Sequence, residues 1–129
     1  IQEVFLMLWN CFCVGAGGFL GAVCRYVLGF LPVSDKTQFP AVTLGINVLG
    51  AFAIGLISQA AVKYGMSDSR WILLLKTGVC GGFTTFSTFA LESSDLAASG
   101  KYGMSVVYMA LSVILCLGAV FAGKMMLRS

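Results

Sequence analysis

Four long apolar stretches, separated by short polar segments, most strongly limit how this chain can fold. A helix needs about 20 predominantly apolar residues to cross a bilayer. The stretches that reach this length are approximately 4–31, 39–62, 70–96 and 102–123. The chain has only 129 residues, so we expect a single all-α transmembrane domain over 1–129. Short loops predict that consecutive spans pack antiparallel.

The composition supports a membrane protein. Apolar residues make up 59% of the chain and charged residues 10%, whereas soluble domains average roughly 25% charged residues. A chain this short is too small to enclose a wide aqueous pore alone, so we expect it to oligomerise. The net charge of +3 is spread along the sequence, which indicates no nucleic-acid partner. The first stretch is too long for a signal-peptide core, and we expect it to be retained.

The basic residues are divided unequally, but only weakly, between the two membrane faces. With four spans, both termini share one face with the loop between the second and third spans. That face carries Lys63, Arg70, Lys76, Lys124 and Arg128, and the other carries Arg25, Lys36 and Lys101. Such a weak bias permits insertion in both orientations. Two oppositely inserted copies could then form an antiparallel dimer, and a fixed orientation with cytoplasmic termini is the alternative.

The segment 77–89 contains residues that a simple spanning helix does not need. Its paired glycines, Gly81 and Gly82, allow the backbone to leave helical geometry. Non-helical backbone at membrane depth is tolerated only where it is buried in protein or lines a watery path. The hydroxyl residues around these glycines therefore predict a broken third helix beside a pore or binding site.

Three phenylalanines accompany this segment. Phe86 and Phe89 share a helical face, and Phe83 lies one step further back. They could pack in the core or face lipid, as phenylalanines in spans commonly do. Alternatively, their positive ring edges could give an anion weak favourable contacts, while nearby hydroxyls replace its hydration in steps.

Other polar residues also lie at membrane depth. Asn47 is near the middle of the second span, with Thr43 one turn before it on the same face. The amide could bond to a neighbouring helix or donate to an ion path. Ser105, Tyr108 and Ser112 form one stripe on the fourth span. Their hydroxyls could donate to an anion or bridge to a second chain, and the serines could instead bond back to their own helix.

The charged residues near the span ends have several possible roles. Arg25 could extend toward the lipid headgroups, attract anions to a vestibule, or tie a dimer together. Lys76 has the same alternatives. Glu92, one turn after Phe89, could line a pore mouth or act as a structural carboxylate.

Small residues four positions apart recur in all four stretches. Such spacing lets helices approach one another closely in lipid, which predicts tight packing. The pairs are Gly17 with Gly21, Gly18 with Ala22, Ala51 with Gly55, Gly78 with Gly82, and Gly118 with Ala122.

In these motifs the chain resembles the Fluc family of fluoride channels, also called CrcB. The longest shared motif is Gly-x-Cys-Gly-Gly-Phe-Thr-Thr-Phe-Ser-Thr-Phe at 78–89. Shorter ones are Gly-Ala-x-x-Arg-Tyr at 21–26, Thr-Leu-x-x-Asn at 43–47 and Tyr-x-x-x-Ser at 108–112. Their order and spacing agree over nearly the whole chain.

The resemblance implies a dual-topology antiparallel homodimer in the bacterial inner membrane. Each dimer would hold two pathways, lined by both subunits, through which cytoplasmic fluoride leaves passively. The implied pathway residues are Phe86, Phe89, Asn47, Ser87, Thr88, Tyr108 and Ser112, with Thr43 as an addition and Arg25 near the vestibule. A structural Na⁺ ion at the dimer centre is also implied, held by the backbone carbonyls of Gly81 and Thr84 from each subunit.

A small proton-coupled multidrug transporter is the main alternative, because such carriers are also short, four-spanning and capable of dual topology. They require a membrane-embedded carboxylate, and only Glu92 and Asp95 touch a span here, both near its end. A non-conducting assembly subunit would not need hydroxyls, an amide and a broken helix at one depth. An enzyme is not expected, since the sequence shows no nucleophile–base pair and no metal cluster.

Overall fold

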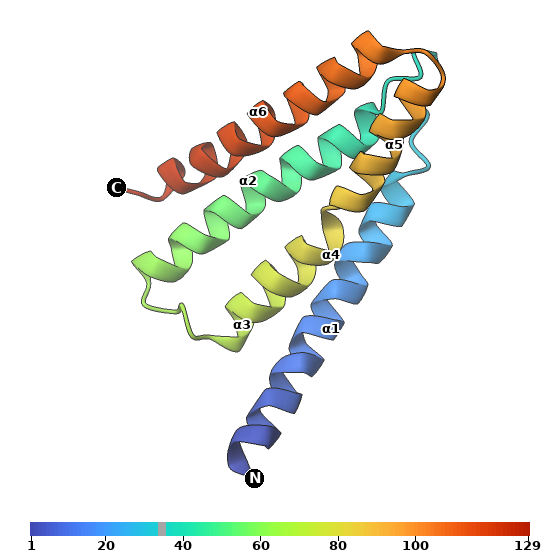
Figure 1. The fold of residues 1–129 in the computed structure, drawn as a ribbon. Helices are drawn as coiled ribbons and strands as arrows, with labels where there is room; N and C mark the ends of the chain where they lie inside the picture. Colours follow the sequence, from blue (N-terminus) through green and yellow to red (C-terminus); the bar gives the residue numbers. More distant parts are fainter. Residues whose placement is uncertain (34–35) are drawn as a thin grey trace.

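The computed structural model describes residues 1–33 and 36–129, which form helices joined by short turns (Figure 1). Three helices are continuous: α1 (Gln2–Leu28), α2 (Ala41–Lys63) and α6 (Tyr102–Met126). The third apolar stretch contains α3 (Arg70–Ile72), the π-helix η1 (Leu73–Cys80), α4 (Gly81–Phe83) and α5 (Phe86–Ala98). Four segments, 2–28, 41–63, 70–98 and 102–126, are long and apolar enough to cross a membrane. The predicted all-α fold with four such segments is confirmed.

Two prolines account for the observed end of α1 and the observed start of α2, which differ from those expected. The residue before a proline disfavours helical geometry, and Leu31 precedes Pro32, so α1 ends at Leu28 rather than Leu31. Pro40 occupies the position before α2, where its missing N–H costs no helical hydrogen bond. Helix α2 therefore begins two residues later than predicted. Of the polar loop expected at 34–36, residues 34–35 lie outside the described part.

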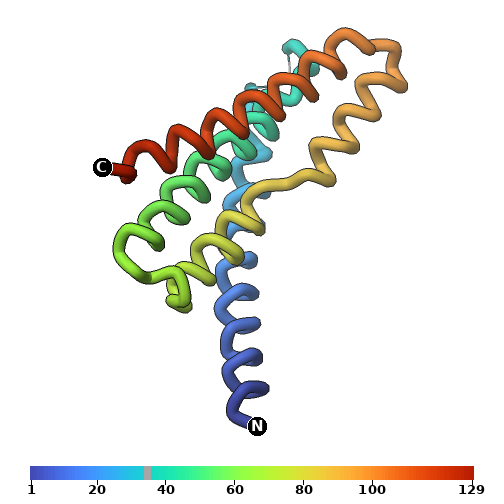
Figure 2. Tube along the Cα trace, turned by 60° about the vertical axis from the view of Figure 1, so that its left-hand side comes forward, coloured from blue at the N-terminus to red at the C-terminus, as the bar shows by residue number. Residues whose placement is uncertain are grey.

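The helices pack in alternate order rather than between sequence neighbours. Helix α1 lies against η1 and α4, and α2 lies along α6 (Figures 1 and 2). Helices α1 and α2 touch only slightly. The prediction that consecutive spans pack together is therefore wrong for the two largest contacts. The first span pairs with the third and the second with the fourth, and each pair runs parallel (Figure 1).

Close backbone contacts explain this pairing. A Cβ atom on Gly17 of α1 would collide with the backbone of Gly78 in η1. In the other pair, a Cβ atom on Gly123 of α6 would collide with the backbone at Phe52 of α2. Glycine lets helices approach this closely, which strengthens their association in lipid. Gly118, one of the small residues expected to serve this purpose, faces open space instead.

The chain crosses the molecule four times, so its turns collect at two ends. Both termini and the α2–α3 turn lie at one end, and the α1–α2 and α5–α6 connections lie at the other (Figure 1). Helix α5 diverges from α2 and contacts it only slightly, and the N-terminal half of α1 extends beyond the other helices (Figure 2). Large apolar side chains are consequently uncovered there: Phe12 of α1 is 67% exposed and Phe86 of α5 is 79% exposed.

Candidate functional site

Two residues with extended backbone, Thr84 and Thr85, separate α4 from α5. Their φ and ψ angles are −77° and 155° for Thr84, and −148° and 117° for Thr85. The Thr84 N–H and hydroxyl both donate to the Cys80 carbonyl, at 3.0 and 2.9 Å, and thereby close α4. The Thr85 hydroxyl oxygen accepts the Thr88 N–H at 3.2 Å, which caps α5.

This geometry releases two backbone carbonyls from the helical hydrogen-bond ladder. In a continuous helix the Gly81 carbonyl would accept the Thr85 N–H, and the Thr84 carbonyl would accept the Thr88 N–H. Here the Thr85 N–H donates to Asn47 Oδ1 at 2.8 Å, and the Thr88 N–H donates to Thr85 Oγ1. The carbonyls of Gly81 and Thr84, the two positions that the resemblance implies as cation ligands, therefore lack the N–H donors of a continuous helix.

Asn47 of α2 holds both backbone polar groups of Thr85. Besides accepting the Thr85 N–H, its Nδ2 donates to the Thr85 carbonyl at 3.0 Å. Backbone groups outside a helix need such partners where lipid excludes water. Of the two roles considered for this amide, the structure shows the interhelical bond. The amide nitrogen carries a second hydrogen, which is available for another acceptor.

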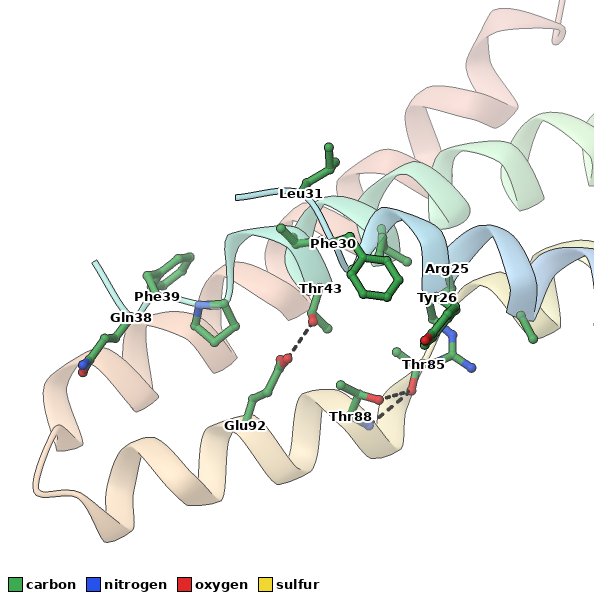
Figure 3. A pocket seen from close by; sticks show the side chains of 15 residues that line it. Arg25, Tyr26, Phe30, Leu31, Gln38, Phe39, Thr43, Thr85, Thr88 and Glu92 are labelled. Carbon is green, nitrogen blue, oxygen red and sulfur yellow. Dashed lines mark hydrogen bonds between the residues drawn. The ribbon is translucent and has the colours of Figure 1, made fainter. Parts of the chain in front are cut away.

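Glu92 of α5 joins three helices through its carboxylate. Thr43 of α2 donates to Oε1 at 2.7 Å, as Figure 3 shows, and Tyr108 of α6 donates to Oε2 at 2.7 Å. Tyr108 is completely buried and Glu92 is half-buried. Because a carboxylate oxygen is a strong acceptor, Glu92 fixes the directions in which both hydroxyls point.

A row of aromatic rings runs from the exposed face of α5 to the interior. The Phe86 and Phe89 centroids lie 5.4 Å apart, and the Phe89 and Tyr108 centroids lie 5.3 Å apart. The Tyr108 ring then meets Phe39 edge-on at 5.6 Å and 84°. Phe86 and Phe89 share a face as predicted. Phe83 is not part of this row, because it lies in α4 before the extended residues and packs against Gly50.

A largely apolar cavity of about 480 Å³ lies beside the aromatic row. Its lining brings together four of the predicted pathway residues: Asn47, Phe86, Phe89 and Ser112. Among the residues that the structure describes, the Ser112 hydroxyl is buried without a hydrogen-bond partner. The third member of its stripe, Ser105, is instead satisfied by donating to the Ser93 carbonyl at 2.7 Å. Ser112 thus offers an unused donor at the wall of this cavity.

A second cavity, of about 720 Å³, is also lined by Thr85 (Figure 3). The predicted residues Arg25, Thr43 and Thr88 line it together with Glu92. The Arg25 Nε donates to the Gly82 carbonyl at 3.3 Å, so this side chain bonds α1 to α4. We call this cavity the vestibule.

The structure places some residues differently from the sequence-based prediction, and it adds one residue that the prediction did not include. Thr85 was not singled out by the sequence-based prediction, yet it lines both cavities and bonds with Asn47. A threonine directly before the helical run 86–98 could have indicated a helix cap. Ser87 is exposed on α5 and lines neither cavity. Lys76 lies apart from both cavities, near Arg70.

The fold and the site together define a multi-pass integral membrane protein with polar residues gathered at a helix interruption. The sequence profile of the family described as CrcB-like protein, Camphor Resistance (CrcB), matches residues 12–124. The chain therefore belongs to the CrcB family.

Curated relatives that carry the name fluoride-specific ion channel FluC match most of the chain. The relative from Ruminiclostridium cellulolyticum is 44% identical over 121 residues, 93% of each chain. That from Elusimicrobium minutum is 44% identical over 121 residues, covering 91% of this chain and 92% of the relative. That from Chlorobaculum tepidum is 38% identical over 123 residues, covering 95% and 98%.

Proposed function

We propose that this protein is a fluoride-selective channel, not an enzyme, that lets cytoplasmic fluoride leave passively down its electrochemical gradient. Membership of the CrcB family and the names of the relatives support fluoride as the ion. On the chain itself, the proposal is carried by the cavity that gathers two phenylalanine rings and the unpartnered Ser112 hydroxyl. An anion supplies the acceptor that this buried donor lacks.

Permeation through such a cavity requires that the ion exchange its water for protein contacts in steps. Ser112 and the second amide hydrogen of Asn47 are donors, and the rings of Phe86 and Phe89 offer positive edges. None of these groups carries a full charge, so the ion is held loosely enough to leave. Thr43, Thr88 and Tyr108 then continue the polar side of the path, with Ser87 at its exposed edge.

The open faces of the chain support a dimer of two oppositely inserted copies in the bacterial inner membrane. Phe86 is 79% exposed and borders a cavity that a single copy leaves open. Two copies related by a two-fold axis would enclose two such pathways. The released carbonyls of Gly81 and Thr84 from both copies would hold a Na⁺ ion at the dimer centre. That ion would supply a fixed positive charge joining the subunits.

Arg25 is positioned to raise the local anion concentration. Its Nε is bonded to the Gly82 carbonyl, which holds the charged group at the wall of the vestibule. A positive charge at the mouth of a low-dielectric path attracts anions. Fluoride would therefore enter through the vestibule before it reaches the aromatic row.

The alternative function, a proton-coupled multidrug transporter, is not favoured by the position of its required carboxylate. Glu92 is the acidic residue that lines the site in the described part of the chain, and both of its oxygens accept hydrogen bonds from hydroxyls. A carrier carboxylate must instead exchange protons for cations.

Flux through reconstituted protein tests the proposal. Purified protein is incorporated into liposomes loaded with fluoride or chloride, and anion efflux is followed with an ion-selective electrode after the membrane potential is released. We expect rapid fluoride efflux and chloride efflux near that of empty liposomes. No fluoride efflux, or equal efflux of both anions, would contradict a selective channel.

A further inference from the structure

A third cavity, of about 320 Å³, lies away from the proposed pathway, between α1 and the α2–α3 turn. The residues that line it are mostly polar: Asn10, Ser67, Asp68, Ser69, Arg70, Ile72, Leu73, Lys76 and Thr77. Arg70 and Lys76 contribute two positive charges and Asp68 one negative charge, which leaves a net charge of +1. Neither the pathway nor the dimer proposed above uses these residues.

The position of the cavity relative to the bilayer limits what can fill it. Arg70 begins the third membrane-length segment, and Lys76 lies six residues further along, roughly 9 Å deeper at helical rise. Lysine can extend its charge back toward the interface along its apolar stem. Trp71 beside Arg70 is 69% exposed, as expected of an aromatic residue at the headgroup level. The cavity is therefore at the depth of lipid headgroups.

The neighbouring surface of α1 is suited to hydrocarbon chains. Leu6 and Met7 lie one turn before Asn10 on the same side of α1, and they are 43% and 56% exposed. A polar, cationic cavity beside such a surface matches both parts of a phospholipid.

We propose that the cavity between α1 and the α2–α3 turn binds the phosphodiester headgroup of an anionic phospholipid. Arg70 and Lys76 contact the phosphate, hydroxyl and amide groups of the cavity donate to the headgroup, and the acyl chains lie on α1. A headgroup of charge −1 neutralises the excess charge of the cavity. A zwitterionic headgroup leaves that excess in place and should bind less well. Basic pockets between transmembrane helices select anionic lipids for this reason.

The two tryptophans of the chain, Trp9 and Trp71, provide a direct probe, because they adjoin the cavity residues Asn10 and Arg70. Bromine atoms on acyl chains quench tryptophan fluorescence at short range. The full chain is reconstituted into phosphatidylcholine vesicles containing increasing fractions of brominated phosphatidylglycerol or of brominated phosphatidylcholine. We expect phosphatidylglycerol to reach half-maximal quenching at a several-fold lower mole fraction. Equal quenching curves for the two lipids would overturn the proposal.

Variants distinguish this site from general attraction to a charged membrane. The double substitution R70Q/K76Q is expected to make the quenching curves of the two lipids coincide. The control K124Q/R128Q removes the same charge at the same end of the molecule, and we expect the two curves to stay separate in it. The proposal is wrong if the control loses the preference equally, or if R70Q/K76Q retains it. Elution of each variant as an intact species in size-exclusion chromatography verifies its fold.

Inorganic phosphate shares the headgroup's chemistry and is tested separately. Millimolar phosphate is added to the vesicles at constant ionic strength. If the site takes a lipid, the preference for phosphatidylglycerol persists. Loss of the preference would instead show a site for the free anion and would contradict the lipid assignment.

Discussion

Asn47 contributes more to the site than one donor for an ion. By taking the Thr85 N–H, its Oδ1 atom prevents that group from closing the helical bond to the Gly81 carbonyl. Its Nδ2 atom binds the Thr85 carbonyl and keeps a second hydrogen for another acceptor. One side chain therefore connects the proposed cation ligands to the proposed anion path.

The substitution Asn47→Ala should weaken both connections. It leaves the Thr85 carbonyl without its donor, at a cost of about 1–3 kcal/mol for a buried group. It also lets the Thr85 N–H return to Gly81, so we expect the stabilisation of the dimer by Na⁺ to fall. Dimer stability is measured by thermal unfolding in sodium and in potassium buffers.

Asn47→Asp is the matched control for this experiment. A carboxylate still accepts the Thr85 N–H, so the response to Na⁺ should remain, while fluoride flux falls because the negative charge repels the anion. An undiminished response to Na⁺ in Asn47→Ala would show that the amide does not support the cation site.

Phe86 and Phe89 are expected to act through their ring edges. Phe86→Ile or Phe89→Ile preserves apolar bulk but removes the quadrupole, which contributes about 0.5–1.5 kcal/mol in aromatic contacts. We expect fluoride flux to fall by up to roughly tenfold, since 1.4 kcal/mol corresponds to a factor of ten. Flux is measured in liposomes and dimer content by size-exclusion chromatography. Phe19→Ile, at a 69% exposed position of α1, should conduct normally. Normal flux in both site variants would exclude this mechanism.

At the level of whole elements, helix pairing depends on glycines that face another backbone. We predict that Gly17→Ala destabilises the protein by about 1–3 kcal/mol, because the new methyl group overpacks the contact with η1. Gly118→Ala meets open space and should be neutral, or stabilising by up to about 1 kcal/mol through helix propensity. Unfolding in mixed detergent micelles measures both variants. Equal effects would show that backbone proximity does not select the helix partners.

The contrast between Gly17 and Gly118 shows how much of the fold could be predicted from the sequence. The lengths of the spans could be predicted from the apolar runs. The observed end of α1 at Leu28 and start of α2 at Ala41 differ from the predicted positions by only three and two residues, because of the neighbouring prolines. The pairing of spans could not be predicted, since glycine spacing looks alike at Gly17, which packs, and at Gly118, which does not. Such a choice depends on the orientation of both helices.

The site was predictable in its members but not in their connections. Four of the predicted pathway residues, including Phe86 and Asn47, line one cavity. That Glu92 would bind both Thr43 and Tyr108 could not be deduced, because these residues come from three helices whose arrangement the sequence does not specify. Thr85 was missed because its importance lies in its backbone rather than its side-chain chemistry.

At the scale of the whole molecule, the weak charge bias predicts that the chain inserts into the membrane in both orientations, and cysteine labelling tests this. A cysteine is introduced at Ser67 in the α2–α3 turn or at Gln38 near the opposite end, both exposed. If the chain inserts both ways, a membrane-impermeant maleimide added to intact cells should label about half of either variant, because a weak Lys/Arg bias does not fix topology. The unsubstituted chain gives the background from its native cysteines. Labelling of only one variant would indicate a fixed orientation.

The alternate pairing of the spans also has a consequence for biosynthesis. Gly17 in α1 meets Gly78 in η1, which follows it by 61 residues in the chain. At roughly 5–20 residues per second, the ribosome needs about 3–12 seconds to supply that partner. During this interval the first span is in the lipid without the helix it will pack on, and the second span must likewise wait for the fourth. The contact between the first and third spans therefore forms only after more than half of the chain has been synthesised.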